Sequence, residues 1–293
     1  MFKLERRRLG RTGYQVSILT IGGCGPGICP DAEMGVKAVQ DAIARGLNML
    51  DIAPSYGEAE LRLGKLVREN RNKLVITEKT MERSREGAWR ELKTSLERLG
   101  ANYFDAYQFH AVGSLEELDA IFSDNGAMKA FLEAKDMGLI KHIGITAHKD
   151  MRVVMEALKR FDFDTILIPV TPISLVHPTP ENDFRPLLKI ARDRDVGVIA
   201  IKAVAKGRWD GEPHHYQTWY HPFDDEESME VGMRFALSQE GVATYPMACD
   251  VRLWPKILKI GESFRRMSDE EQRKAVEYVK ARGASPLFPE PAQ

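Results

Sequence analysis

The stretch Asn48–Gly57, "NMLDIAPSYG", ends an apolar run on a carboxylate and presents a tyrosine shortly afterwards. Asp51 closes the run, and Tyr56 follows beyond a proline. A carboxylate at the end of an apolar strand is tolerated only when a cation or hydrogen-bond donors pair with it. The stretch therefore predicts a strand whose end belongs to a polar site.

Eight runs of this kind, β-branched or apolar, alternate along the chain with amphipathic stretches of helical period. Strands that alternate with helices imply parallel crossovers. The chain has 293 residues, and the first run is not followed by the GxGxxG of an open dinucleotide-binding sheet. Several runs also end in ionisable residues. We therefore predict an α/β fold, a (β/α)8 TIM barrel, formed as a single domain by residues 1–293. The runs span 16–23, 47–53, 73–79, 104–110, 140–146, 164–170, 197–203 and 242–247.

Three further segments decorate the predicted barrel. Residues 3–17 alternate polar and apolar side chains around "GRTG", which predicts a β-hairpin that caps the barrel bottom. Residues 206–227 are too long for a plain connection, and we expect either a lid or a packed excursion on the barrel rim. Residues 264–293 hold a C-terminal helix, which Ser268 and Glu271 begin as a capping box, and a proline-rich tail.

Composition limits the partners and the compartment. The net charge is −1, from 42 basic and 43 acidic residues, which gives no reason to expect nucleic acid or a membrane surface as a partner. The N-terminus lacks the apolar region of a signal peptide, and no run approaches the length of a membrane span. Cys24, Cys29 and Cys249 lack regular spacing, which predicts no disulfide framework and a cytoplasmic protein. We expect Cys24 and Cys249 to be small buried hydrophobic side chains, and we expect no metal site.

Four ionisable residues form the candidate catalytic group. Asp51, Lys79 and His110 end consecutive predicted strands, and Tyr56 follows the first of them. An ammonium nearby favours the phenolate, so Lys79 should lower the pKa of Tyr56 from its usual value of about 10. Asp51 would hold Lys79 in place, and a neutral His110 could polarise a carbonyl.

The residues around this group resemble the aldo-keto reductase family. The motifs are "LDIAPSYGEAELRLGKLVRE" (50–69), "LVITEK" (74–79) and "DAYQFH" (105–110). The resemblance extends over roughly residues 9–263. It implies a barrel that binds NADPH at its C-terminal mouth and reduces an aldehyde or ketone by hydride transfer, or catalyses the reverse oxidation.

By this resemblance Tyr56 is the general acid, Lys79 and Asp51 tune it, and His110 orients the carbonyl. Two alternatives stay open. One is an NADPH-binding regulatory or sensor subunit with little turnover, and the other is a metal-dependent barrel hydrolase or lyase. The resemblance also implies a small-molecule carbonyl substrate and a monomer or weak homo-oligomer.

The cofactor residues depart from the family pattern. Thr146 and His148 stand where the family often has Ser-Asn, and Leu167 stands where it has a glutamine. Lys202 replaces the aromatic residue that commonly stacks on the nicotinamide, and Arg252 with Lys256 could read a 2′-phosphate. We therefore favour NADPH/NADP+ and leave NADH open. The implied cofactor contacts are Gly23, Asp51, Thr146, His148, Lys202, Ala203, Val204, Ala205, Met247, Asp250, Arg252 and Lys256.

Overall fold

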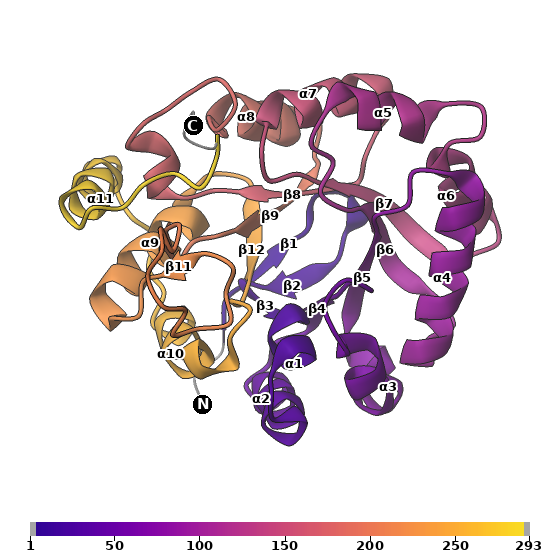
Figure 1. Cartoon of the computed structure of the whole chain (residues 1–293), viewed down its shortest axis with the longest axis horizontal. Helices are drawn as coiled ribbons and strands as arrows, with labels where there is room; N and C mark the ends of the chain where they lie inside the picture. Colours follow the sequence, from indigo (N-terminus) through magenta and orange to yellow (C-terminus); the bar gives the residue numbers. More distant parts are fainter. Residues whose placement is uncertain (1–3, 290–293) are drawn as a thin grey trace.

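The barrel predicted from the alternating runs is present. A computed structural model describes residues 4–289, and within them eight parallel strands close in the order β12-β3-β4-β5-β6-β7-β8-β9 (Figure 1). Each strand falls on one of the predicted runs, with only β5 extending one residue beyond its run, so the fold prediction is confirmed. The strands are β3 (Leu19–Gly22), β4 (Met49–Asp51), β5 (Val75–Thr80), β6 (Phe104–Phe109), β7 (Ile140–Thr146), β8 (Thr165–Pro169), β9 (Gly197–Ile201) and β12 (Val242–Pro246).

Helices surround the strands and bury one face each, as α4 illustrates. Ser84 begins α4 (Arg85–Leu99) by accepting a hydrogen bond from the Gly87 amide, and Gly100 ends it with a φ of 61°. Leu92 and Leu99 are buried against the barrel. The other helices are α1 (Cys24–Ile28), α2 (Ala32–Ala44), α3 (Ala59–Asn70), α5 (Leu115–Phe122), α6 (Ala127–Asp136), α7 (Met151–Arg160), α8 (Arg185–Asp193), α9 (Glu226–Ser238), α10 (Trp254–Glu262) and α11 (Asp269–Ala281), with 3-10 turns η1 (Gly10–Thr12), η2 (Arg71–Lys73), η3 (Pro172–Leu175) and η4 (Val251–Leu253).

The N-terminal hairpin closes one end of the barrel. It consists of β1 (Arg6–Arg8) and β2 (Gln15–Ser17), which pair antiparallel. Leu9 and Val16 from this hairpin join a buried cluster with strand residues of the barrel interior, so the predicted cap is present. Gly10 fits here because a Cβ would lie 2.1 Å from the Gly197 amide nitrogen at the start of β9.

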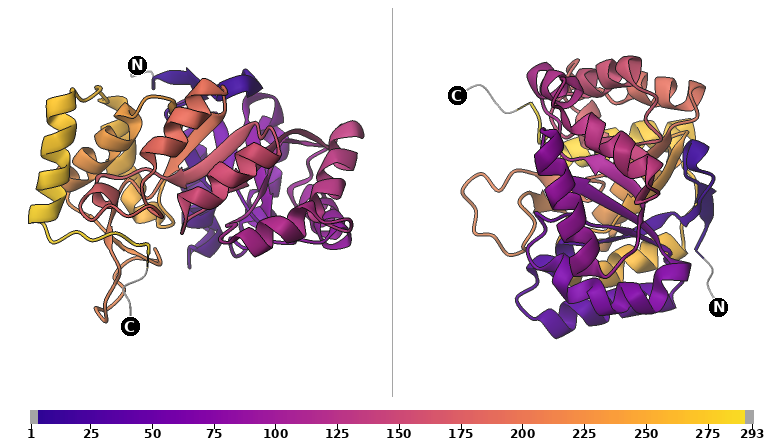
Figure 2. Two further views of the ribbon diagram at one scale, coloured as in Figure 1. Left: turned by 90° about the horizontal axis from the view of Figure 1, so that it is seen from above. Right: turned by 90° about the vertical axis from the view of Figure 1, so that its right-hand side faces the viewer.

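The long loop lies at the opposite end from the hairpin (Figure 2). The short strands β10 (Ala205–Gly207) and β11 (His221–Pro222) pair antiparallel and hold its two ends together. Near the C-terminus, Ser268 and Glu271 form the predicted capping box at the start of α11. Within the described residues, no helix has both the length and the apolar character needed to cross a membrane.

Candidate active site

Asp51 and Lys79 form an ion pair inside the barrel, at the C-terminal ends of β4 and β5. Lys79 Nζ lies 2.8 Å from Asp51 Oδ2 and donates to the Ile52 carbonyl oxygen at 2.9 Å. The Thr77 hydroxyl donates to Asp51 Oδ1 at 2.8 Å. The Lys79 side chain is 0% exposed and the Asp51 side chain 4% exposed, so each charge depends on the other for its stabilisation.

Tyr56 and His110 lie beside this pair. Lys79 Nζ is 4.8 Å from the centroid of the Tyr56 ring. The Tyr56 and His110 ring centroids are 5.7 Å apart, in an edge-to-face arrangement. Ser55 Oγ lies 3.4 Å from His110 Nδ1. The structure thus brings the four residues of the candidate catalytic group together at one mouth of the barrel.

Burial sets the protonation states of this group. Burial raises the pKa of Tyr56, and the charge and hydrogen bond of Lys79 only partly oppose it. The expected lowering of that pKa is therefore wrong in its net direction, although Lys79 does act in the expected sense. Burial alone would lower the pKa of Lys79, but Asp51 and Tyr56 outweigh it and raise the value. Burial and then Lys79 hold the pKa of His110 well below its usual range. At neutral pH the phenol is therefore protonated and the imidazole neutral.

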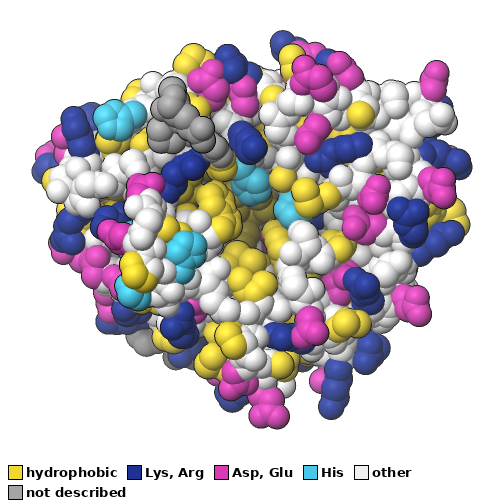
Figure 3. Space-filling model, viewed as in Figure 1, with side chains coloured by type: hydrophobic (Ala, Val, Ile, Leu, Met, Phe, Trp, Pro, Cys, Tyr) yellow, Lys and Arg dark blue, Asp and Glu magenta, His cyan; other side chains and the backbone are white. Residues whose placement is uncertain are grey.

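A cavity opens beside Tyr56. Asp51, His148, Lys202 and Met247, four of the residues expected to contact a cofactor, line it. In the space-filling view of this face, hydrophobic and histidine side chains surround a central hollow (Figure 3). Residues that sequence reasoning missed also line the cavity, and all but Tyr220 and Ala248 come from strand ends that the run boundaries could have indicated. They are Gly22, Ile201, Tyr220, Tyr245, Pro246 and Ala248.

The cavity offers features that fit a nicotinamide ring. His148 Nδ1 is buried and has no hydrogen-bond partner in the described part of the chain. A Cβ at Gly22 would lie 2.2 Å from the Met247 carbonyl oxygen, so the backbones of β3 and of the segment after β12 approach closely beside the cavity. Thr146, by contrast, accepts a hydrogen bond from the Ala111 amide at 2.7 Å. The other expected cofactor residues lie outside the lining: Gly23, Thr146, Ala203, Val204, Ala205, Asp250, Arg252 and Lys256.

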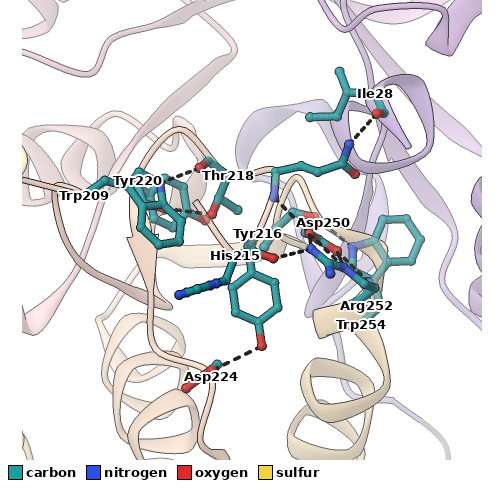
Figure 4. Close-up of polar contacts among 12 residues, drawn as sticks. Ile28, Trp209, His215, Tyr216, Thr218, Tyr220, Asp224, Asp250, Arg252 and Trp254 are labelled. Atoms are coloured by element: carbon teal, nitrogen blue, oxygen red, sulfur yellow. Dashed lines mark hydrogen bonds and ion pairs between the residues drawn. The ribbon is translucent and has the colours of Figure 1, made fainter. Parts of the chain in front are cut away.

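Hydrogen bonds hold the loop 206–227 across the rim of the barrel mouth (Figure 4). The Gln217 amide donates to Asp250 Oδ2 at 2.9 Å, and Gln217 Nε2 donates to the Ile28 carbonyl oxygen at 2.7 Å. Arg252 pairs with Asp250 at 2.6 Å and donates to the His215 carbonyl oxygen at 2.7 Å. The loop therefore bridges α1, which follows the first barrel strand, and η4, which follows the last one.

Further contacts order the loop itself. Trp209 is stacked between His214 and His221, each with its ring centroid 4.6 Å away, and Trp209 Nε1 donates to the Thr218 carbonyl oxygen. Lys256 contacts the Asp224 carbonyl oxygen. Both candidate phosphate-binding residues, Lys256 and Arg252, thus already have partners in or beside this loop. Across residues 4–289, no three His, Cys, Asp or Glu side chains gather as a group that could hold a metal ion.

Cys24 and Cys249 form a disulfide at the same rim, so the predictions of no disulfide and of two isolated hydrophobic side chains are wrong. Their Cα atoms are 4.9 Å apart although 225 positions separate them in sequence. Barrel closure places β3 beside β12, so the residues after these two strands become neighbours. Both cysteines line the cavity, whereas Cys29 is free and buried.

Comparison with known proteins agrees with this geometry. A closed eight-stranded barrel is also the fold of aldo-keto reductases of known structure. The model of the Aldo/keto reductase family matches residues 19–279, and the chain belongs to this family of NAD(P)H-dependent oxidoreductases.

Named relatives share the family and part of their length. The chain is 27% identical over 218 residues to the uncharacterized oxidoreductase YqkF of Bacillus subtilis, covering 70% of this chain and 66% of the relative. It is 29% identical over 222 residues to L-galactose dehydrogenase of Arabidopsis thaliana, covering 71% and 67%. The matched region thus spans about two thirds of the length of each of these relatives. An aldo-keto reductase of Bacillus halodurans in its holo form has the same fold, with a TM-score of 0.72, 20% identity and 98% of each chain covered.

Proposed function

We propose that this protein reduces an aldehyde or ketone with a nicotinamide dinucleotide, or catalyses the reverse oxidation, as a single barrel domain. The observation that carries the proposal is the buried Lys79–Asp51 pair at 2.8 Å, with the Tyr56 ring above the ammonium and beside the cavity. A neutral His110 completes the group. The membership of the chain in the Aldo/keto reductase family supports the same reaction class.

Each side chain of the candidate catalytic group has its own role in the reduction of the carbonyl. The bound dinucleotide would supply the hydride to the carbonyl carbon. Tyr56, protonated at neutral pH, donates its proton to the carbonyl oxygen, and the adjacent Lys79 stabilises the phenolate that remains. Asp51 holds Lys79 charged. The neutral His110 donates an N–H to the carbonyl oxygen and orients it. In the oxidation direction Tyr56 would accept the proton.

The dinucleotide would lie against the residues that line the cavity. His148 and Lys202 are the polar candidates beside the ring, and Met247 offers an apolar surface. We propose NADPH over NADH because Arg252, although paired with Asp250, has 51% of its side chain exposed, and because Lys256 lies in the first turn of α10. We further propose a small-molecule carbonyl substrate, a monomer or weak homo-oligomer, and a cytoplasmic location, although the Cys24–Cys249 disulfide removes the cysteine argument for that compartment.

The test measures turnover and binding separately. Oxidation of NADPH and of NADH is followed at saturating concentration with a panel of aldehydes and ketones, and dinucleotide dissociation constants are measured by fluorescence. We expect turnover of at least one carbonyl and tighter binding of NADPH. Tight binding without turnover across the panel would instead support the regulatory-subunit alternative. Binding of neither dinucleotide would contradict both.

A further inference from the structure

Lys202 follows β9 and reaches into the barrel mouth from an uncommon backbone conformation. Its φ is 68°, a value that residues with side chains rarely adopt. The residue lines the cavity beside Tyr56 and also a second, narrow cavity, and His148 is shared by the same two cavities. Lys202 therefore lies where the two cavities meet.

The ammonium of Lys202 has no acidic partner in the described part of the chain. Burial is the only influence on it, and this burial lowers the pKa of Lys202 to about 7. Aromatic rings contact the ammonium instead, with Nζ 4.5 Å from the Trp219 centroid and 4.8 Å from the Tyr220 centroid. Asp51 is the only carboxylate that lines either cavity among residues 4–289, and it is paired with Lys79.

The neighbours of Lys202 supply polarity without positive charge. His148 is held neutral because burial, and then Lys202, lower its pKa to about 3. His148 Nδ1 is buried without a partner. The rest of the second cavity is mostly apolar, with Ile173 and Phe288 among its walls. Lys202 and His148 are partly buried, so a cation here interacts more strongly with an anion than a cation at the open surface does.

We propose that Lys202 binds a carboxylate carried by the carbonyl substrate, so that the substrate class is oxo acids and aldehyde acids. This inference rests on the proposed function. The carboxylate would lie against the Lys202 ammonium at the junction of the two cavities, and the nicotinamide ring would pack against the Lys202 stem, His148 and Met247. The carbonyl would then face Tyr56 and His110. A monoanionic carboxylate suits a single lysine in a small apolar cavity better than a doubly charged phosphate does.

The test compares 4-oxobutanoate with its neutral methyl ester on the full chain. We expect the wild type to favour the acid by about tenfold or more in kcat/KM, the effect of a desolvated charge pair. Lys202→Met should bring the acid-to-ester ratio close to one, chiefly through the KM of the acid, and Lys202→Arg should restore part of it. Lys206→Met is the matched control, because Lys206 lies four positions on and lines neither cavity, and it should keep the wild-type ratio.

A binding measurement separates this inference from the proposed function. Butanoate, a monoanion with no aldehyde or ketone group to reduce, should bind the wild type and Lys206→Met but not Lys202→Met, as measured by tryptophan fluorescence and calorimetry. An ester used as well as the acid by the wild type, or an unchanged ratio in Lys202→Met, would overturn the inference and leave the reductase proposal standing. If neither compound is turned over, the proposed function is in question. Butanoate binding that depends on Lys202 would then support the carboxylate site, and its absence would overturn it.

Discussion

Asp51 and Lys79 are joined at 2.8 Å with almost no access to water. Each charge in such a pair compensates the other, because either charge left alone would be buried without a partner. The position of both side chains at the ends of neighbouring strands makes the pair part of the barrel wall as well as part of the site. A substitution of Asp51 or Lys79 should therefore change both the free energy of unfolding and the proposed catalytic activity.

Asp51→Asn should destabilise the protein strongly because it leaves the Lys79 ammonium buried and unpaired. We expect a loss of about 3–5 kcal/mol in the free energy of unfolding, measured by urea denaturation. Asp193→Asn is the control: it removes a pair with Lys189 in which both side chains are more than half exposed, and should cost less than about 1 kcal/mol. Similar losses in the two variants would show that the Asp51–Lys79 pair does not behave as a buried one.

His148 should make the fold sensitive to acid. Burial, followed by Lys202, lowers its pKa from 6.5 to about 3, so between these values the unfolded chain binds a proton that the folded chain does not. Stability therefore falls as the pH drops from 6.5 towards 3, by up to about 2 kcal/mol at pH 5 from this residue.

The measurement is the free energy of unfolding near pH 7.5 and near pH 5. His148→Gln should lose less stability between these conditions than the wild type does, with the part caused by His110 remaining. His177→Gln, at an exposed position, should behave as the wild type does. A wild-type pH dependence in His148→Gln would contradict the assignment.

Lys202 should titrate near neutrality. Burial lowers its pKa to about 7, and the structure places no acidic partner beside it in the described residues. NMR of the protein with ¹³C-methylated lysines should show an amine that titrates near pH 7 and is missing in Lys202→Met but present in Lys206→Met. If every lysine signal titrates above about pH 9, the described environment of Lys202 is wrong.

The disulfide predicts a simple thiol count. Of the three cysteines, only Cys29 is free, so the denatured protein should react with one equivalent of thiol reagent before reduction and three afterwards. Replacing Cys24 and Cys249 by serine should lower the free energy of unfolding by about 2–5 kcal/mol. Three reactive thiols without reductant would show that the bond does not form in solution.

The strands and the candidate catalytic group were predictable because their signals are local. Each strand is an apolar run, and Asp51, Lys79 and His110 stand at the ends of consecutive runs, which a closed barrel brings together. Parallel strands buried on both faces need such runs, so the sequence carries the pattern directly. The hairpin cap was readable for the same reason.

The missed features depend on contacts between distant segments. The Cys24–Cys249 bond arises from the closure of β12 onto β3, and the spacing of the cysteines gives no sign of it. The ion pair between Arg252 and Asp250 depends on the direction of the two side chains. The hydrogen bond from Gln217 to the Ile28 carbonyl oxygen in α1 depends on the path of a long loop. The net pKa of Tyr56 was misjudged because burial outweighs the charge of Lys79, and the degree of burial is a tertiary property.

The most direct test of Tyr56 as the proton donor compares the turnover of Tyr56→Phe with that of Tyr14→Phe. Tyr14 packs with the cluster at the hairpin end of the barrel, so its hydroxyl serves as a matched control away from the mouth. We expect Tyr56→Phe to lose about 10²–10⁴-fold in kcat while the dinucleotide dissociation constant changes by less than about twofold. Tyr14→Phe should keep the wild-type kcat. Wild-type turnover in Tyr56→Phe would contradict the role of this phenol as the proton donor.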